Sequence, residues 1–318
     1  MKIFYHITLF LITVGWLAMG CIQSPKANVT QEANKSDSAA YHWTKLMDSA
    51  QWKKTYNYQL MAMGDTLWLL HPDGFWFSMD GKAWQRSAMD DIVGNQAFLD
   101  YVVFKGAVYG LGTFEGNIEK NTFTTAVHRT TDFKKWERVA DKSELPSRFF
   151  YHPFVFQDKI WIIGGEDSKG QFDDLWSSSD AIHWQKEADH LPFGKRSGSQ
   201  VLTFHGKLYL LDSDVWVSED ALHWQQLTPE ILPGQQLFGY KAVVFDQKIW
   251  LLGCNRNGLF SNQVLYSEDG KNWQTQDAPW LPRGGVAAAV FKDKVYLTGG
   301  KYGGTPEHTE FRYDNDLW

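Results

Sequence analysis

Short apolar runs separated by polar turns recur along most of the chain. Examples are YVVF, VLTF and KAVVF, and VLTF is followed by the turn His205-Gly206 and then by a second run, KLYLL. Runs of this length that are rich in β-branched and aromatic residues predict β-strands, and the turns predict hairpins between them. The pattern therefore predicts an all-β chain.

The second strand of each hairpin carries an aromatic residue at a fixed place. The six copies are TLWLL, AVYGL, KIWII, KLYLL, KIWLL and KVYLT, and their aromatic residues are Trp68, Tyr109, Trp161, Tyr209, Trp250 and Tyr296. We call these six residues the strand aromatics. Their recurrence divides the chain into six units.

A seven-residue phrase follows each of the first five strand aromatics. Its copies are SMDGKAW, TTDFKKW, SSDAIHW, SEDALHW and SEDGKNW, which end at Trp84, Trp136, Trp184, Trp224 and Trp273. Ser, Thr and Asp side chains accept hydrogen bonds from backbone N–H groups just ahead of them and so hold a tight turn. The phrase therefore predicts a turn, and its Trp predicts the start of an outer, half-exposed strand.

The two repeats keep a nearly constant register. The phrase Trp and the next strand aromatic are 25, 25, 25, 26 and 23 residues apart, and Trp43 lies 25 residues before Trp68 in the similar context YHWTK. A period of about 40–50 residues with four strands is typical of β-propeller blades. Because the chain ends at NDLW, before a sixth phrase Trp, we expect the strand around Trp43 to complete the last blade and remove two sheet edges. The fold prediction is a six-bladed β-propeller of four-stranded blades over residues 42–318.

Composition agrees with this fold prediction and mainly limits which classes of partner the chain could bind. Aromatic residues make up 16% of the chain, which suits a packed β domain. The net charge is −6, with both signs mixed along the chain and no basic block, so we expect no nucleic-acid partner. We also expect a monomer.

The first 41 residues differ from the rest of the chain. Residues 1–20 begin with Lys2 and continue as an apolar run, which predicts a signal peptide. LAMGC resembles the lipobox of bacterial lipoproteins, in which Cys21 is acylated, although Ala18 stands where the lipobox usually has Leu. A plain signal peptide with an incidental Cys21 is the alternative. Residues 21–41 are polar and predict a flexible tether.

The lipoprotein interpretation has consequences for location and for cysteine chemistry. It implies a membrane partner through the lipid anchor and a place in the bacterial cell envelope, where Ile22 after the Cys favours the outer membrane. If Cys21 is acylated, Cys254 is the remaining thiol, which excludes an intrachain disulfide and a Cys-rich metal site. We therefore expect no metal site and no cofactor.

Three motifs connect the units with a known family. Gly-Gly pairs follow the second strand at Gly164-Gly165 and Gly299-Gly300, DDLW opens the third strand, and the phrase Trp opens the fourth. With LPSRFFYHPFVFQDKIWIIGG, these motifs make the chain resemble the kelch and galactose-oxidase-type propellers. The resemblance implies the scaffold and says little about activity, because propellers carry many functions. The copper chemistry of galactose oxidase is disfavoured, because Cys254 lies outside that family's Tyr–Cys motif and no His pair has metal spacing.

The units differ most in the segment between their second and third strands. It is long in units two, three, five and six and rich in Gly, Asn and charge, as in GCNRNGLFSNQ and GGKYGGTPEHTE. Long loops on a rigid scaffold usually carry binding. We therefore expect the ligand on the face where these loops emerge.

Candidate ligand residues lie near the start of the inner strands. Arg148, Arg196 and Arg283 stand 13 residues before the strand aromatics of units three, four and six, and three guanidinium groups at one height would bind carboxylates. The alternative is that these arginines belong to the kelch consensus and bond neighbouring loops. His152 and Tyr240 fall near the same height and are either channel-facing or packed. Glu166 is either a general base or a solvated loop acid.

These observations favour a binding module over an enzyme. Many charged loops without an evident catalytic set fit the recognition of a glycan, an anionic sugar above all, or of a protein partner. The alternative is an enzyme that resembles the bacterial sialic-acid mutarotases, which are exported kelch propellers. Their activity would be the mutarotation or epimerisation of a sugar.

Overall fold

The computed structural model describes residues 41–56, 58–88, 100–112, 124–306 and 308–318. The chain divides into two compact units, Met1–His42 and Trp43–Trp318, and every described strand belongs to the second unit. None of the described residues is helical, as an all-β chain requires. The predicted signal peptide, Cys21 and nearly all of the predicted tether lie outside the described residues.

Antiparallel four-stranded sheets make up most of the second unit. Five such sheets occur among the described residues, and in each the strands pair in chain order. Their strands are β1 (Gln59–Met63), β2 (Thr66–His71), β3 (Gly74–Ser78) and β4 (Gln85–Arg86); β5 (Asp100–Phe104), β6 (Ala107–Leu111), β7 (Val127–Thr130) and β8 (Glu137–Ala140); β9 (Phe154–Phe156), β10 (Lys159–Ile163), β13 (Leu175–Ser178) and β14 (Gln185–Ala188); β15 (Gln200–Phe204), β16 (Lys207–Leu211), β17 (Val215–Ser218) and β18 (Trp224–Thr228); and β20 (Lys241–Phe245), β21 (Lys248–Leu252), β24 (Gln263–Ser267) and β25 (Gln274–Asp277).

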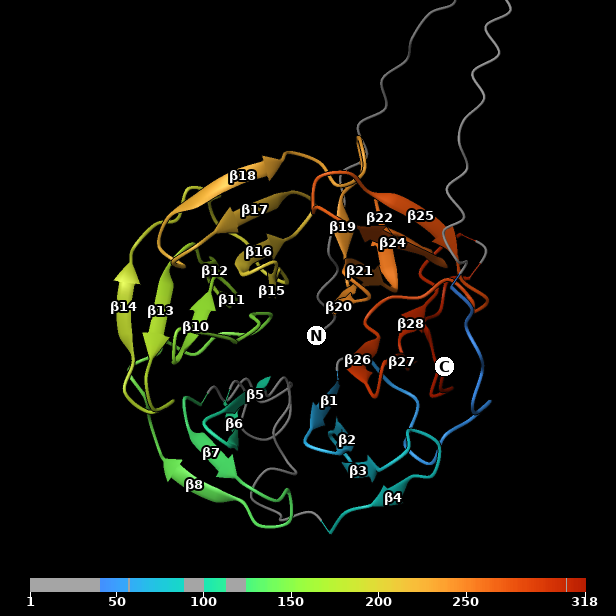
Figure 1. Ribbon diagram of the computed structural model, residues 1–318, viewed down its shortest axis with the longest axis horizontal. Coiled ribbons are helices and arrows are strands. Elements are labelled where there is room, and N and C mark those ends of the chain that lie inside the picture. The colour runs from blue at the N-terminus through green and yellow to red at the C-terminus, as the bar shows by residue number, and fades with distance from the viewer. Residues whose placement is uncertain (1–40, 57, 89–99, 113–123, 307) are drawn as a thin grey trace, which may run out of the picture. The chain divides into compact units, whose positions relative to one another are not determined.

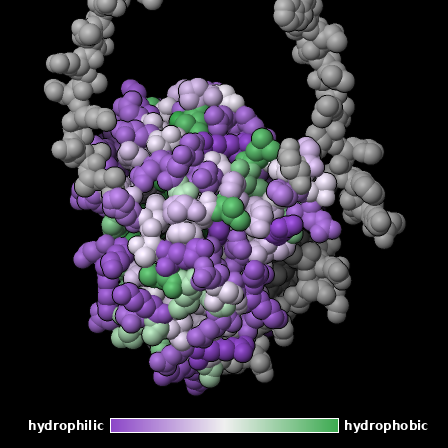
Figure 2. All heavy atoms as spheres, turned by 90° about the vertical axis from the view of Figure 1, so that its right-hand side faces the viewer, coloured by the Kyte–Doolittle hydropathy of each residue, from purple (hydrophilic) through white to green (hydrophobic). Residues whose placement is uncertain are grey.

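The sheets surround a common centre, and the first strand of each sheet lies nearest to it (Figure 1). Strands β1, β5, β15 and β20 face the centre, whereas β4, β8, β14, β18 and β25 lie at the outside. This is the arrangement of a β-propeller. Hydrophilic side chains predominate on the face that Figure 2 shows, with apolar ones in scattered small groups.

A further sheet begins with β26 (Ala287–Phe291) and β27 (Lys294–Thr298). Leu317 continues this sheet, because it forms a bridge with Thr298 on one side and with Met47 on the other. The N–H of Leu317 donates to the carbonyl oxygen of Met47 at 3.0 Å, and the N–H of Leu46 donates to that of Leu317 at 2.7 Å. Residues from the two ends of the second unit therefore lie in one sheet.

Three short hairpin segments project from the connections between second and third strands. They contain β11 (Glu166–Asp167) with β12 (Gly170–Gln171), β22 (Cys254–Arg256) with β23 (Leu259–Ser261), and β28 (Lys301–Tyr302) with β29 (Arg312–Tyr313). Strand β19 (Leu237–Phe238) pairs with β22. The long segments that the sequence indicated thus form ordered structures in units three, five and six.

The seven-residue phrases form the turns that their sequence predicts. In the last copy the N–H of Gly270 donates to Ser267 Oγ at 2.8 Å, and the N–H groups of Lys271 and Asn272 donate to Asp269 Oδ1 at 2.8 and 2.7 Å. The same bonds recur in the other four copies. The indole N–H of Trp273 then donates to the Gly270 carbonyl oxygen at 3.0 Å, which fixes the Trp over its own turn.

The hydrophobic core lies between neighbouring sheets rather than in one central mass. Trp68 of the first sheet stacks on Phe133 of the second sheet, with 4.1 Å between the ring centroids. Tyr209 and Leu251 belong to a buried cluster shared by the β15–β18 and β20–β25 sheets. Aromatic pairs of this kind add stability beyond the area they bury. The centre of the ring is thus left to the polar ends of the inner strands.

Candidate functional site

One residue in each unit occupies the same position at the start of the innermost strand. These residues stand nine positions before the strand aromatics and are Gln59, Asp100, His152, Gln200, Lys241 and Ala287. We call them the axial ring. The backbone register agrees, because Gln59, Asp100, Gln200 and Lys241 pair with Leu70, Leu111, Leu211 and Leu252. His152 lies two residues before β9.

Two cavities meet at the axial ring. The larger has a volume of about 310 Å³ and is lined by Asp100, Lys241 and loop residues such as Phe238, Phe260 and Lys301. We call it the loop-face pocket. The smaller has a volume of about 170 Å³ and is lined by inner-strand residues that include Met61. We call it the axial cavity. Because Gln59, His152, Gln200 and Lys241 line both, the ring forms the floor of the loop-face pocket.

Three titratable side chains of the axial ring face this floor. His152 Nδ1 and Asp100 Oδ1 are 3.8 Å apart, which is too long for a direct hydrogen bond. Burial raises the pKa of the Asp100 carboxyl to about 8, against the opposing charge of Lys241. Burial and the charge of Lys241 lower the pKa of His152 to about 3. Near neutral pH, Asp100 therefore holds its proton and His152 is a neutral imidazole.

The pKa of Lys241 is lowered by burial, and the charge of Asp100 acts in the opposite direction. Among the described residues, no side chain forms an ion pair or a hydrogen bond with the Lys241 ammonium group. The ring thus places a desolvated amine at the pocket floor, opposite a carboxylic acid.

The two glutamines of the ring join neighbouring inner strands. Gln59 Oε1 accepts a hydrogen bond from the N–H of Tyr101 at 3.1 Å, and Gln200 Oε1 accepts one from the N–H of Ala242 at 3.0 Å. Gln200 Nε2 also donates to the carbonyl oxygen of Tyr240, so both ends of its amide are bonded to the scaffold. The Gln59 oxygen is held by the next sheet, and its Nε2 makes no hydrogen bond with the residues that the structure describes.

Aromatic side chains wall the loop-face pocket. Tyr56, Phe238, Phe260 and Phe311 all line it, and Phe238 and Phe311 are 53% and 50% exposed. The Lys301 ammonium lies 4.4 Å from the ring centroid of Tyr56 and 4.9 Å from that of Phe311, in cation–π geometry. Burial lowers the pKa of Lys301. Apolar ring faces and a positive group therefore stand side by side at the pocket wall.

The three arginines that the sequence singled out do not meet in this pocket. Arg148 is 1% exposed and donates from both terminal nitrogens to Asp174, at 2.6 and 3.0 Å. Arg283 is 2% exposed and makes the same pair of bonds with Asp316. Arg196 donates to Asp214 at 3.0 Å. None of these arginines lines the loop-face pocket.

These ion pairs link each arginine to the Asp that precedes the third strand of the same unit. Arg148 Nη1 also donates to the carbonyl oxygen of Gly164 at 2.8 Å, and Arg283 Nη1 donates to that of Gly299 at 3.2 Å. Burial raises the pKa of Asp174, but the hydrogen bonds and charge of Arg148 outweigh it and keep that pKa below its usual value. These contacts fit the alternative interpretation, in which the arginines bond neighbouring loops.

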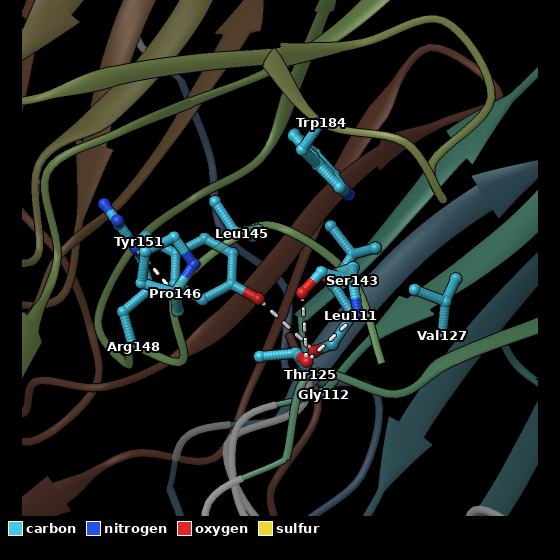
Figure 3. A pocket seen from close by; sticks show the side chains of 10 residues that line it. All are labelled: Leu111, Gly112, Thr125, Val127, Ser143, Leu145, Pro146, Arg148, Tyr151 and Trp184. Atoms are coloured by element: carbon cyan, nitrogen blue, oxygen red, sulfur yellow. Dashed lines mark hydrogen bonds between the residues drawn. The ribbon is translucent and has the colours of Figure 1, made fainter. Parts of the chain in front are cut away.

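The surroundings of Arg148 are shown in Figure 3. Arg148 lines a cleft of about 10 Å³, which has room for about one water molecule. There the Tyr151 hydroxyl donates to the Leu111 carbonyl oxygen at 3.3 Å, and Thr125 bonds with Ser143 across the cleft (Figure 3). The cleft is a packing detail between two sheets, too small for a ligand.

The other expected residues divide between the pocket and the scaffold. His152 and Tyr240 line the loop-face pocket, and the Tyr240 hydroxyl donates to the Asp212 carbonyl oxygen at 2.9 Å. Glu166 does not line it; its Oε2 accepts a hydrogen bond from Ser197 Oγ at 2.7 Å. Asp100 and Lys241 were missed by the sequence reasoning. A spacing of nine residues before the strand aromatics, instead of thirteen, would have found them.

Comparisons with known proteins agree with the architecture. Residues 130–318 match the family model described as the DUF6242 beta propeller domain. Beta-scruin of Limulus polyphemus is 26% identical over 225 residues, which cover 62% of this chain and 24% of that protein. The leucine-zipper-like transcriptional regulator 1 homolog of Drosophila melanogaster is 20% identical over 309 residues, 83% of this chain and 31% of that protein.

Two further matches carry the same fold information. The kelch repeat protein M-T8 of Myxoma virus is 25% identical over 79 residues, 24% of this chain and 15% of that protein. The chain therefore spans less than a third of the length of these relatives. Among solved structures, that of YjhT superposes with a TM-score of 0.66 at 13% identity, covering 86% of this chain and 96% of the other. Together these similarities support a kelch-type β-propeller.

Proposed function

Because the chain belongs to the DUF6242 beta propeller domain family and is a kelch-type β-propeller, we propose that it is a binding module whose loop-face pocket holds an anionic sugar. The observation that carries this proposal is the pocket itself. It combines aromatic walls with two lysines, Lys241 at the floor and Lys301 at the wall.

The size and lining of the pocket suit a small polar ligand. Its volume of about 310 Å³ lies at the lower end of the range of about 300–1,000 Å³ that is usual for ligand pockets. Exposed aromatic rings such as those of Phe238 and Phe311 can stack on the apolar face of a sugar ring, while hydroxyl groups bond to polar side chains at the floor. The positive charge of Lys301 favours an acidic sugar over a neutral one.

A protein loop is the second occupant that the pocket could take. Phe238, Leu259 and Phe311 are exposed apolar residues of the loop segments, as at the anchors of many protein interfaces. The concave shape and the polar floor favour the sugar, because a protein interface is usually a broad, standard-sized patch. A glycan is therefore our first choice.

We propose that the propeller has six blades and that the strand around Trp43 closes the last one. The bridge between Leu317 and Met47 supports this, since it repeats the pairing of Leu175 with Ala188. Met47 and Ala188 each lie four residues after a Trp, Trp43 and Trp184. The T-shaped contact of Trp43 with Trp280, at 4.6 Å between centroids, adds a packed ring at this place.

We propose that the propeller is held at a membrane by a lipid on Cys21, in the outer membrane of a bacterial cell envelope. The support is the lipobox-like sequence LAMGC and the polar tether after it. Across the ranges that the structure describes, no helix combines the length and apolar character needed to cross a membrane.

A sugar mutarotase or epimerase is the alternative function, and one pair of residues favours it. Asp100 in its protonated form and neutral His152 are a carboxylic acid and a base, 3.8 Å apart at the pocket floor. Such a pair can give a proton to one oxygen of a substrate and take one from another.

The experiment is a glycan array probed with the chain from residue 22 onward. We expect binding to glycans that end in sialic or uronic acids and weaker binding to their neutral counterparts. Proton NMR of anomer exchange in the bound sugar decides between the two functions. Exchange at the spontaneous rate leaves a binding module, whereas accelerated exchange that Asp100→Asn removes makes it an enzyme. An array without any bound glycan contradicts the sugar proposal and leaves the protein partner.

A further inference from the structure

The axial ring contains one partly buried amine, that of Lys241, and few other titratable groups. The residues facing Lys241 from the other inner strands are Gln59 of β1, Asp100 of β5, His152 before β9 and Gln200 of β15. Ala287 of β26 adds no polar group. The charge balance of this floor, among the described residues, therefore depends on Asp100, His152 and Lys241.

The nearby tyrosines do not change this balance. Burial raises the pKa of Tyr58, Tyr101 and Tyr240 above the ordinary tyrosine value, so their hydroxyl groups stay neutral. His152 is neutral because burial and Lys241 lower its pKa. Gln59 and Lys241 both line the loop-face pocket, and Lys241 Nζ and Gln59 Nε2 have no hydrogen-bond partner among the described residues.

We propose that this floor is a carboxylate subsite, in which one carboxylate of the ligand accepts hydrogen bonds from Lys241 Nζ and Gln59 Nε2 and lies beside Asp100. The inference rests on the proposed sugar-binding function for the rest of the ligand and assigns its acidic group to the ring. Lys301 at the wall then contacts the sugar ring region rather than the carboxylate.

Charge balance selects a carboxylate over other groups. A single negative charge neutralises the single ammonium of Lys241, and a protonated Asp100 adds a third donor. A phosphate with two negative charges would leave an uncompensated buried charge beside Asp100, and an amine would face Lys241 directly. Lys241 Nζ and Gln59 Nε2 also supply separate N–H donors, and a carboxylate has two oxygens to accept them.

The subsite makes binding depend on pH in a defined direction. The ligand needs Asp100 in its acid form, and the pKa of Asp100 is about 8. As pH rises through that value, Asp100 loses its proton and two carboxylates would share one ammonium group. Affinity for the acidic ligand therefore falls above pH 8, and binding at that pH is accompanied by proton uptake because the bound carboxylate raises the pKa of Asp100.

The test compares D-glucuronate with D-glucuronamide, which has the same shape and no charge, by calorimetry on the parent chain and on Lys241→Met. We expect the parent to bind glucuronate roughly tenfold or more tightly than the amide, and the variant to lose this preference. Lys207→Met, at a surface ion pair with Glu219, is the matched control and keeps the preference. Thermal melting checks folding, and Lys241→Met should not lower Tm because a buried ammonium is replaced by an apolar group of similar length.

The outcomes separate the subsite from the pocket. Equal binding of both sugars by the parent leaves the sugar pocket intact and overturns the carboxylate subsite. If neither sugar binds, the proposed sugar-binding function fails for uronic acids, and acetate is then used to test the carboxylate subsite. A shift of the His152 ring signals on acetate addition in the parent but not in Lys241→Met supports the subsite, and no shift overturns it. In Asp100→Asn the fall in affinity above pH 8 should be smaller than in the parent, and an unchanged fall contradicts the role of Asp100.

Discussion

The fourth residue of each seven-residue phrase has a left-handed backbone, with φ of 74° at Gly81, 59° at Phe133, 69° at Ala181, 68° at Ala221 and 73° at Gly270. Only two of the five are Gly, so the turn tolerates the cost of a side chain where neighbours leave room for it. Phe133 uses its side chain to stack on Trp68 of the preceding sheet. At Gly270 an added Cβ would lie 2.6 Å from the Tyr209 ring.

Gly270→Ala should therefore be strongly destabilising. The left-handed backbone costs about 1–2 kcal/mol for a residue with a Cβ, and overpacking against Tyr209 adds about 1–3 kcal/mol. Gly206→Ala is the matched control, because its φ is 76° and nothing lies within 4 Å of the added Cβ. Urea unfolding should show the larger loss for Gly270→Ala. Equal losses of unfolding free energy in the two variants would mean that the structure relaxes around the Tyr209 contact at no cost.

At the scale of elements, the loops are tied to the sheets by buried ion pairs. Arg148 joins the segment before β9 to Asp174 before β13, and its guanidinium also lies 4.3 Å from the Phe172 ring. Arg283 makes the equivalent link from the segment before β26 to Asp316. The pocket wall formed by these segments is therefore held by groups that the ligand does not need to contact.

Arg148→Ala should lower the free energy of unfolding without weakening ligand binding. Removing one partner of a buried, bidentate ion pair leaves Asp174 uncompensated and costs about 3–5 kcal/mol. Arg148→Lys keeps the charge but loses the two parallel hydrogen bonds of the guanidinium group. Its stability should therefore lie between that of the parent and that of Arg148→Ala. Chemical unfolding and calorimetry on the same proteins check both quantities. A variant with parental stability and a lost ligand would instead make Arg148 a binding residue.

At the scale of the whole molecule, residues from the two ends of the Trp43–Trp318 unit lie in one sheet. The bond from the N–H of Ala50 to the Asn315 carbonyl oxygen, at 3.0 Å, repeats the bond from Leu191 to Asp173, at 2.8 Å. The same contacts are thus made by chain neighbours in one sheet and by distant segments in the other. Stability of the ring should depend on the segment around Trp43.

Two truncations test this dependence. Deletion of residues 22–40 should leave the melting temperature unchanged, because Leu46, Met47 and Ala50, which bond to residues 315–317, all remain. Deletion of residues 22–48 removes Trp43, Leu46 and Met47 and should lower the melting temperature. The backbone hydrogen bonds of Leu46 and Met47 with Leu317 are lost, at about 0.5–1.5 kcal/mol each, together with the contact of Trp43 with Trp280. Equal melting temperatures would contradict closure by this strand.

Attachment of the whole molecule to a membrane is tested at Cys21. Cys21→Ser removes the thiol that a lipid would occupy, and we expect the protein to move from the membrane to the soluble fraction. Cell fractionation with an antibody against the propeller measures this directly. Cys254→Ser is the control, since that thiol is buried and its loss should leave the fractionation unchanged. An unchanged membrane fraction of Cys21→Ser would exclude the lipid anchor.

Much of the architecture could be read from the chain because its signals are local. The Ser or Thr and the Asp of each phrase bond to amides within three residues, so seven consecutive residues determine the turn. The strand aromatics recur with the same hairpin around them, and repetition turns six local patterns into a propeller prediction. Trp43 could be matched for the same reason, by its distance to Trp68.

The chemistry of the site depended on the tertiary structure. Arg148 finds its partner Asp174 26 residues away, so sequence alone left open whether its charge faces a ligand or a carboxylate of its own chain. Asp100 and Lys241 come from different sheets and meet only because both inner strands start at the centre of the ring. Burial at that centre, which no local pattern encodes, raises the pKa of Asp100 and lowers the pKa of Lys241. Local hydrogen bonds determine the blades, whereas long-range packing decides which charges share a low-dielectric floor.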